Sequence, residues 1–248
     1  MTTRFDGTAA LITGAGSGMG RAITLRLASE GAAVMAVDID EGGLAETRFL
    51  ATGTVSVRVV DVADPAACAE AVAAAVTEFG RLDVLGNVAG IYVPAHVTET
   101  SVDLYRRTLA VNLDGPFFLS QAAIPHLVAA GGSIINIASN AGVQGVPYSA
   151  AYAASKGGLI QLTRSLAVEY IKTPLRVNAI APAGTLTNIA RTVKFPEDRD
   201  PDLARRMGGY RGVAMPEEIA ALFAFLASSE AKSITGAVYA VDNGLTAS

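Results

Sequence analysis

The stretch AALITGAGSGMGRAITLRLASEG, residues 9–31, joins a short apolar run to a helical pattern through a turn that contains four glycines. The run AALIT has the length and composition of a buried strand, and the apolar residues after the turn recur at helical spacing. The glycines permit a tight turn and allow backbone N–H groups to approach an anion at the helix N-terminus. Because any strand–helix turn can require glycine, the rest of the chain must show whether this turn binds a phosphate.

The same alternation of strand-like and helix-like segments continues along the chain. Further apolar runs that end in small or polar residues lie at 32–38, 55–62, 82–90, 131–139, 174–182 and 236–244. Helical patterns lie at 41–52, 65–80, 101–130 and 150–172. Seven strands separated by helices predict an α/β fold: a Rossmann-type, doubly wound parallel sheet with helices on both faces, in a single domain over 1–248.

Composition sets limits on the function. Apolar residues make up 51% of the 248 positions and tryptophan is absent, which suits the aliphatic core of a covered parallel sheet. The net charge of −4, without a basic tract, gives no support for nucleic-acid or anionic-membrane binding. Cys68 is the only cysteine, so it is expected to be a small helix residue, and no metal site is predicted. No apolar run reaches ~18 residues, so we expect a cytoplasmic protein.

Polar and small residues follow several of the predicted strands. Asp38 ends the second strand, where its carboxylate would accept hydrogen bonds from ribose hydroxyls and repel a 2′-phosphate. No arginine or lysine lies in the glycine turn or directly after Asp38, so the charges favour NAD over NADP, although a helix-capping role for Asp38 stays open. Asp61 and Val62 can face an adenine ring, and the small residues of 87–90 can pack against a cofactor.

The segment YSAAYAASKGG, residues 148–158, places Tyr152 and Lys156 four positions apart, on one face of a predicted helix. Free tyrosine has a pKa near ~10 and is a poor base at neutral pH, but a neighbouring cation favours the tyrosinate. The same spacing also occurs in ordinary amphipathic helices, with a half-buried aromatic ring and a solvated lysine. The segment alone does not separate the two interpretations.

Together these motifs resemble those of the short-chain dehydrogenase/reductase superfamily, in its compact single-domain branch, over nearly the whole chain. TGAGSGMG matches the family's glycine turn, and YAASK matches its Tyr-x-x-x-Lys pair. NVAG matches its strand end, with Val88 in place of a second asparagine. VNAIAPAGTLT resembles its Pro-Gly-x-x-x-Thr segment, with Ala183 where glycine is usual.

The resemblance implies an oxidoreductase that interconverts a secondary alcohol and a ketone with NAD. It implies four catalytic residues: Tyr152 as general acid/base, Ser139 on the substrate oxygen, Lys156 holding the ribose and lowering the pKa of Tyr152, and Asn112 anchoring a water. The expected cofactor contacts are Gly14, Ser17, Gly18, Met19, Asp38, Asp61, Val62, Asn87, Ala89, Gly90, Tyr152, Lys156, Pro182, Gly184, Thr185 and Thr187.

The expected substrate contacts are mostly small or apolar, which suggests an alcohol or ketone with a hydrophobic or cyclic body. They are Ser139, Ala141, Val146, Tyr148, Tyr152 and Ala183. The charged segment 186–213, which follows a strand end, is expected to be a substrate-binding loop. His96 is expected to be an exposed loop residue.

Two alternatives to this function remain. The first is a 3-oxoacyl-thioester reductase that uses NADPH, against which Asp38 argues. The second is a non-catalytic cofactor-sensing protein, which would need no proton relay. The resemblance also implies a homodimer or homotetramer formed through long helices.

Overall fold

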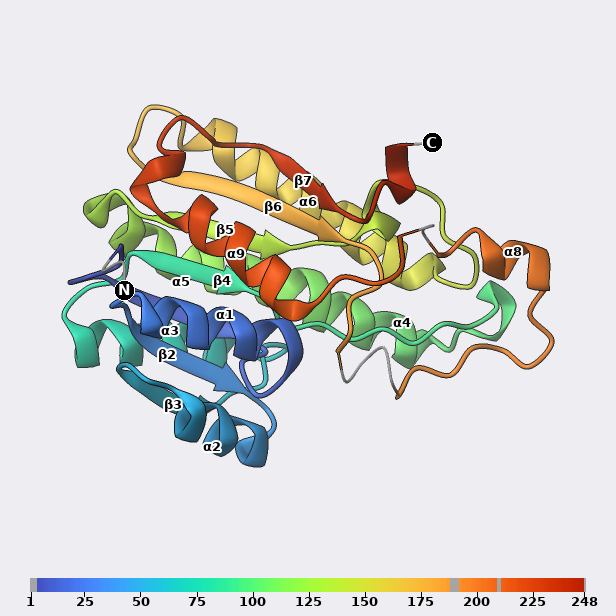
Figure 1. Cartoon of the computed structure of the whole chain (residues 1–248), viewed down its shortest axis with the longest axis horizontal. Helices are drawn as coiled ribbons and strands as arrows, with labels where there is room; N and C mark the ends of the chain where they lie inside the picture. Colours follow the sequence, from blue (N-terminus) through green and yellow to red (C-terminus); the bar gives the residue numbers. More distant parts are fainter. Residues whose placement is uncertain (1–3, 188–191, 209–210, 248) are drawn as a thin grey trace.

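All seven predicted strands are present, and they pair in parallel in one sheet of order β3-β2-β1-β4-β5-β6-β7 (Figure 1). The computed structural model describes residues 4–187, 192–208 and 211–247. The strands are β1 (Ala9–Thr13), β2 (Ala33–Asp38), β3 (Val55–Val59), β4 (Val84–Asn87), β5 (Ser133–Ile137), β6 (Arg176–Pro182) and β7 (Val238–Val241). This order confirms the predicted doubly wound, Rossmann-type sheet in a single domain.

Helices cover both faces of the sheet, as predicted. They are α1 (Gly18–Ser29), α2 (Glu41–Leu50), α3 (Pro65–Phe79), α4 (Val102–Leu109), α5 (Gly115–Ala130), α6 (Ala150–Glu169) and α9 (Pro216–Ala227), whereas the short helix α8 (Pro201–Arg205) lies away from the sheet. Successive residues of β1 face opposite sides: Ile12 packs in a cluster with residues of α1, α2 and α9, whereas Leu11 packs with residues of α3, α5 and α6. Cys68 is a buried helix residue, as expected.

Two helical features differ from the sequence expectation. The pattern over 101–130 is not one helix, because a π-helical turn, Ala110–Asp114, separates α4 from α5. Such turns widen the backbone by one residue and often lie at functional sites, and this one carries Asn112. Helix α9 lies outside the helices expected from the sequence; it packs beside α1 over the sheet, in front of it in Figure 1.

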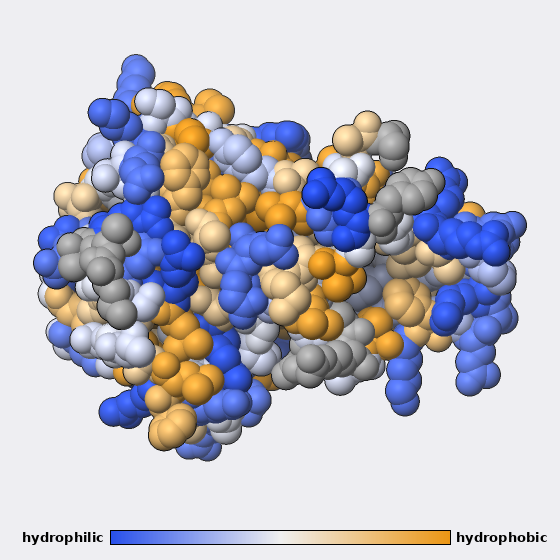
Figure 2. All heavy atoms as spheres, viewed as in Figure 1, coloured by the Kyte–Doolittle hydropathy of each residue, from blue (hydrophilic) through white to orange (hydrophobic). Residues whose placement is uncertain are grey.

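The segment between β6 and α9 extends away from the sheet. Residues 192–208 of this segment contain the short helix α8 and lie at the far end of the molecule from the N-terminus (Figure 1). Hydrophilic side chains gather over this end, as Figure 2 shows. Within the described residues, no helix combines the length and apolarity needed to cross a bilayer.

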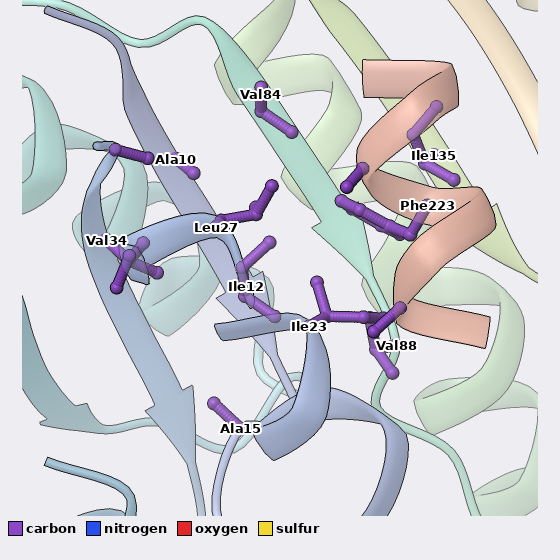
Figure 3. Packing of buried hydrophobic residues seen from close by; sticks show 14 of the residues in the cluster. Ala10, Ile12, Ala15, Ile23, Leu27, Val34, Val84, Val88, Ile135 and Phe223 are labelled. Atoms are coloured by element: carbon purple, nitrogen blue, oxygen red, sulfur yellow. The ribbon is translucent and has the colours of Figure 1, made fainter. Parts of the chain in front are cut away.

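Phe223 fills the space between α9 and the central strands. Its side chain is fully buried and lies near Ile12, Val84 and Ile135 (Figure 3). Gly86 of β4 leaves room for this ring, because a Cβ atom there would lie 2.9 Å from Phe223 Cζ. The ring therefore fixes α9, and with it the end of the extended segment, to the sheet.

Truncation of Phe223 to alanine should lower the free energy of unfolding by about 3–5 kcal/mol, because it leaves a cavity in a close-packed core. Phe49→Ala is the matched control: that ring is 86% exposed, so the change should stay within ~0.5 kcal/mol. Urea unfolding followed by far-ultraviolet circular dichroism measures both variants, since the chain has no tryptophan. Equal losses would contradict the central packing role of Phe223.

Candidate active site

The hydroxyl of Thr13 ties the end of β1 to the end of β4. Its Oγ1 accepts hydrogen bonds from the N–H groups of Val88 and Ala89, both at 2.9 Å, and donates to the carbonyl of Gly86 at 3.3 Å. The next residue, Gly14, has φ +66°, and a Cβ there would lie 2.9 Å from the backbone of Ala89. Only glycine permits this approach, so the glycine turn lies directly beside the 87–90 segment.

The glycine turn also brings Asp38 into position. Oδ2 of Asp38 accepts a hydrogen bond from the N–H of Gly16 at 2.8 Å, which holds the carboxylate beside the start of α1. In the described structure no side chain caps α1, and its first turn carries no acidic residue. The helix N-terminus therefore keeps its N–H groups and partial positive charge available for an anion.

Beside the turn lies a pocket of about 220 Å³, here named the glycine-turn pocket. Ten of the residues expected from the sequence to contact the cofactor line this pocket: Gly14, Ser17, Gly18, Met19, Asp38, Asp61, Val62, Ala89, Gly90 and Thr187. Arg107 of α4 also lines it, a residue that no motif in the sequence indicated. Its guanidinium pairs with both carboxylate oxygens of Asp61, at 3.0 and 3.2 Å.

The Arg107 ion pair affects the charge at Asp61. Burial acts to raise the pKa of Asp61, but hydrogen bonds from the Ala63 N–H and from Arg107 outweigh it and place the pKa below its ordinary value. Arg21, which follows the glycine turn, is also paired: its Nη2 lies 2.7 Å from the Glu46 carboxylate. Both arginines near the turn thus have acidic partners.

A second pocket, of about 320 Å³, lies beyond the ends of β4, β5 and β6 and is named here the tyrosine pocket. The residues expected from the sequence to contact cofactor or substrate that line this pocket are Met19, Gly90, Ser139, Ala141, Val146, Tyr152, Lys156, Pro182, Ala183, Gly184, Thr185 and Thr187. The two pockets share Met19, Val88, Gly90, Ile91 and Thr187. They therefore adjoin along one edge of the sheet.

Ser139, Tyr152 and Lys156 meet in the tyrosine pocket. The Ser139 hydroxyl lies close to the Tyr152 hydroxyl and acts to lower its pKa. The Ser139 hydroxyl also donates to Asn140 Oδ1 at 3.1 Å and accepts from the Ala141 N–H at 3.2 Å. Lys156 Nζ donates to the carbonyl of Ile137 at 2.7 Å and lies 5.9 Å from the centre of the Tyr152 ring.

The protonation of the tyrosine differs from the sequence expectation. Burial raises the pKa of Tyr152 to about 12; the Ser139 hydroxyl opposes this shift, and the neighbouring Tyr92 adds to it. Burial lowers the pKa of Lys156 to about 8. The expected lowering of the Tyr152 pKa by Lys156 is therefore absent from the protein alone, because Lys156 is buried, Tyr152 is partly buried and desolvation dominates.

Asn112 lies behind this pocket in the π-helical turn. Its Oδ1 accepts from the Ile91 N–H at 2.8 Å, and its Nδ2 donates to the Ile91 carbonyl at 3.0 Å and to Ser155 Oγ at 3.1 Å. A Cβ on Gly90 would lie 3.2 Å from Asn112 Oδ1 and 3.4 Å from Lys156 Nζ, so the two side chains are neighbours. The amide is fully buried and both of its protons are used.

Two residues that we predicted as contacts, Asn87 and Tyr148, are not among the described residues that line either pocket. Asn87 is buried in the sheet and donates to Asn136 Oδ1 at 2.8 Å, so its side chain supports β5 and is not directed at a cofactor. Tyr148 accepts a hydrogen bond from the Asp200 N–H at 2.8 Å, and its ring lies edge-on to His96. His96 in turn contacts Asp198 at 2.9 Å. The predicted substrate residue Tyr148 therefore joins the 192–208 segment to the body.

Sequence reasoning missed several residues of the tyrosine pocket. Tyr92 lies two positions beyond the NVAG motif and could have been proposed from its place after β4. Val193, Phe195 and Met207 come from within the segment expected to form the substrate loop, but nothing in the sequence distinguished them from their charged neighbours. Arg191, in the same segment, lies outside the described residues.

The depressed pKa of Lys156 gives a pH-dependent prediction. Below about pH 8 the buried Lys156 of the folded protein is charged, whereas in the unfolded chain it keeps its proton up to about pH 10.5. The free energy of unfolding should therefore rise as the pH increases between these two values. Relative to Lys156→Met, the wild type should gain about 2 kcal/mol of unfolding free energy between pH 7.5 and 10. Lys172→Met, at an exposed position, should show no such trend in urea unfolding. A pH-independent difference for Lys156→Met would contradict the assignment.

Comparison with known proteins identifies the family. A family model described as enoyl-(acyl carrier protein) reductase matches residues 14–246. The chain is 39% identical to meso-2,3-butanediol dehydrogenase of Serratia marcescens over 252 residues, which cover 99% of this chain and 97% of the relative. It is 40% identical to 3-oxoacyl-(acyl-carrier-protein) reductase of Thermotoga maritima over 248 residues, 98% of this chain and 99% of the relative.

A solved structure agrees with these matches. The 3-ketoacyl-(acyl-carrier-protein) reductase from Brucella melitensis, complexed with NADH, is 31% identical and superposes with a TM-score of 0.88 over 98% of this chain and 99% of that chain. Sequence and fold thus agree over almost the full length. The chain belongs to the short-chain dehydrogenase/reductase superfamily, and it is an oxidoreductase.

Proposed function

We propose that this protein is an NAD-dependent oxidoreductase that interconverts a secondary alcohol and a ketone, with Tyr152 as general acid/base. The observation that carries the proposal is the position of Ser139, Tyr152 and Lys156 in a pocket that adjoins the glycine-turn pocket. A substrate oxygen beside Tyr152 would thus lie next to the reactive end of a dinucleotide bound along the sheet edge. The similarity to meso-2,3-butanediol dehydrogenase supports alcohol chemistry.

The residues at the sheet edge fit NAD. The uncapped start of α1 suits a pyrophosphate, and Asp38 lies where it can accept hydrogen bonds from ribose hydroxyls. When bound, NAD supplies the hydride acceptor and the positive charge of its oxidised nicotinamide. The nicotinamide end would be held by residues of the tyrosine pocket that follow β6 or end it. They are Pro182, Gly184, Thr185 and Thr187.

The proton chemistry follows from the pKa values. With a pKa of about 12, Tyr152 carries its proton at neutral pH and is ready to protonate a ketone oxygen. Ser139 would bind the same oxygen as negative charge grows on it. In the oxidation direction Tyr152 must first lose its proton. Lys156, with a pKa of about 8, exchanges protons near neutral pH, and the Ile137 carbonyl holds its ammonium in place.

Two further features are proposed on structural support. The segment 186–213 acts as the substrate-binding loop, since Val193, Phe195 and Met207 line the tyrosine pocket. The chain forms a homodimer or homotetramer through its long helices, which expose large apolar side chains. These are Val102, Tyr105, Phe117 and Val168.

A second candidate is a 3-oxoacyl-thioester reductase. It is supported by the 40% identity to the Thermotoga maritima enzyme. Asp38 separates the candidates less well than the charge argument suggested, because the related Brucella melitensis reductase was solved with NADH. Purified protein assayed with a 3-oxoacyl thioester and with a panel of secondary alcohols, each with both dinucleotides, distinguishes them.

Tyr152→Phe should lower kcat by about 10²–10⁴-fold, because it removes the proton that the reaction transfers, and should leave the Kd for NAD within a few-fold. Tyr105→Phe, at a half-exposed position on α4, is the matched control and should keep wild-type activity. Steady-state kinetics and NADH fluorescence titration measure the two effects. Substantial residual turnover would exclude Tyr152 as the acid/base. NAD binding by the wild type without turnover of any alcohol or ketone would instead favour the sensing role.

Asp38→Ser should reduce the preference for NAD over NADP by at least tenfold in kcat/KM, since it removes the charge that repels a 2′-phosphate. Asp40→Ser is the matched control: Asp40 caps α2 through the Gly43 N–H, and serine can also cap. Its cofactor ratio should match that of the wild type. A wild-type enzyme that prefers NADP would overturn the cofactor assignment.

A further inference from the structure

Tyr92 is a second tyrosine in the tyrosine pocket, and the proposed mechanism does not use it. Its ring lies 4.6 Å from the ring of Tyr152, tilted by 46°, and Phe195 of the 192–208 segment lies edge-on to its other side at 6.2 Å. Tyr92 therefore forms the pocket wall between the reacting tyrosine and the predicted substrate loop.

The proton of the Tyr92 hydroxyl has a defined direction. Tyr92 Oη lies 2.8 Å from Ser149 Oγ, and Ser149 Oγ donates to the carbonyl of Pro147 at 3.0 Å. A serine hydroxyl has one proton, so for both contacts to be hydrogen bonds Tyr92 must donate to Ser149. The Tyr92 oxygen is left with a lone pair and no proton to offer. It can accept a hydrogen bond from a hydroxyl, but it cannot donate one to a carbonyl, ether or carboxylate.

The rest of the pocket limits the charge of the substrate. Among the described residues that line it, Lys156 is the only charged one, and its ammonium is held by the Ile137 carbonyl. The lining also contains the apolar residues Ile91, Val193, Phe195 and Met207. Among the described lining residues, a carboxylate or phosphate would meet no cation other than Lys156, which already donates to the Ile137 carbonyl. The volume of about 320 Å³, part of which a nicotinamide ring would fill, suits a small molecule.

We propose that Tyr92 is a specificity residue that accepts a hydrogen bond from a second hydroxyl of the substrate, and that the substrate is a small, neutral diol. The second hydroxyl lies on the carbon next to the reacting one, because the rings of Tyr92 and Tyr152 are in contact, with centroids 4.6 Å apart. This inference rests on the proposed function. It excludes a 3-oxoacyl thioester as the preferred substrate, since such a compound presents only carbonyls to Tyr92.

The test compares substrates that differ only at the second oxygen. Cyclohexanol lacks it, cis- and trans-1,2-cyclohexanediol carry it as a hydroxyl, and 2-methoxycyclohexanol carries it without a proton. The wild type with NAD should have a kcat/KM about tenfold higher for at least one of the two diols than for cyclohexanol and 2-methoxycyclohexanol. Tyr92→Phe should lower the value for that diol to the level of cyclohexanol and leave cyclohexanol within about twofold.

A second variant tests the direction of the hydrogen bond. Ser149→Ala removes the acceptor that holds the Tyr92 proton and leaves the Tyr92 oxygen in place. The released proton can then be donated to an ether oxygen. The kcat/KM for 2-methoxycyclohexanol should therefore rise several-fold relative to that for the diol. No gain would contradict the assigned direction. Circular dichroism of each variant shows whether the fold is kept.

The outcomes separate this inference from the proposed function. If the wild type oxidises cyclohexanol as well as it oxidises the diols, the proposed alcohol chemistry stands and the role of Tyr92 is wrong. If Tyr92→Phe lowers kcat/KM equally for cyclohexanol and the diol, Tyr92 only braces the start of α6 through Ser149. If the wild type binds NAD and oxidises none of the four compounds, the proposed function fails, and the inference fails with it.

Discussion

The hydroxyl of Thr13 is the contact on which the site depends. By accepting from two N–H groups of β4's end and donating to Gly86, it holds the ends of β1 and β4 together at the point where the strand order reverses. Gly14 then lies against Ala89 without a side chain between them. This approach places the glycine turn, Asp38 and the small residues of 87–90 around one pocket, and it lets that pocket adjoin the one that holds Tyr152. The positions that we propose for cofactor and substrate thus depend on a single backbone junction.

Burial then determines the chemistry at Tyr152 and Lys156. Withdrawal from water favours the uncharged form of each group, so the tyrosine keeps its proton and the lysine titrates closer to neutral pH. In the proposed function, this state suits donation of a proton to a ketone oxygen. Alcohol oxidation would require removal of the tyrosine proton, and the positive charge of the oxidised cofactor would favour that removal. The proposal therefore couples cofactor binding to the acid/base chemistry of Tyr152.

The sequence predicted those parts of the molecule that local pattern determines. Strands, the glycine turn and the Tyr152–Lys156 spacing depend on neighbours in sequence, and all are where the pattern placed them. Tyr92 follows the end of β4, a position from which it could have been proposed. Arg107 is different, because it reaches its pocket through tertiary packing that no local signal encodes. The raised pKa of Tyr152 was missed for a related reason: helix spacing shows that a lysine is near but not how deeply both groups are buried. Asn87 lies in a motif associated with the cofactor, yet its side chain bonds to β5.

The central claim is that Tyr152 removes a proton while hydride passes from a substrate carbon to NAD. Transfer of deuterium tests this most directly. The wild-type protein is incubated with NAD and with cyclic secondary alcohols and 1,2-diols deuterated at the carbinol carbon, and the nicotinamide product is examined by mass spectrometry. The account predicts one deuterium per reduced nicotinamide for at least one compound, formed about 10²–10⁴-fold more slowly by Tyr152→Phe. Reduced nicotinamide without deuterium, or equally fast transfer by Tyr152→Phe, would contradict it.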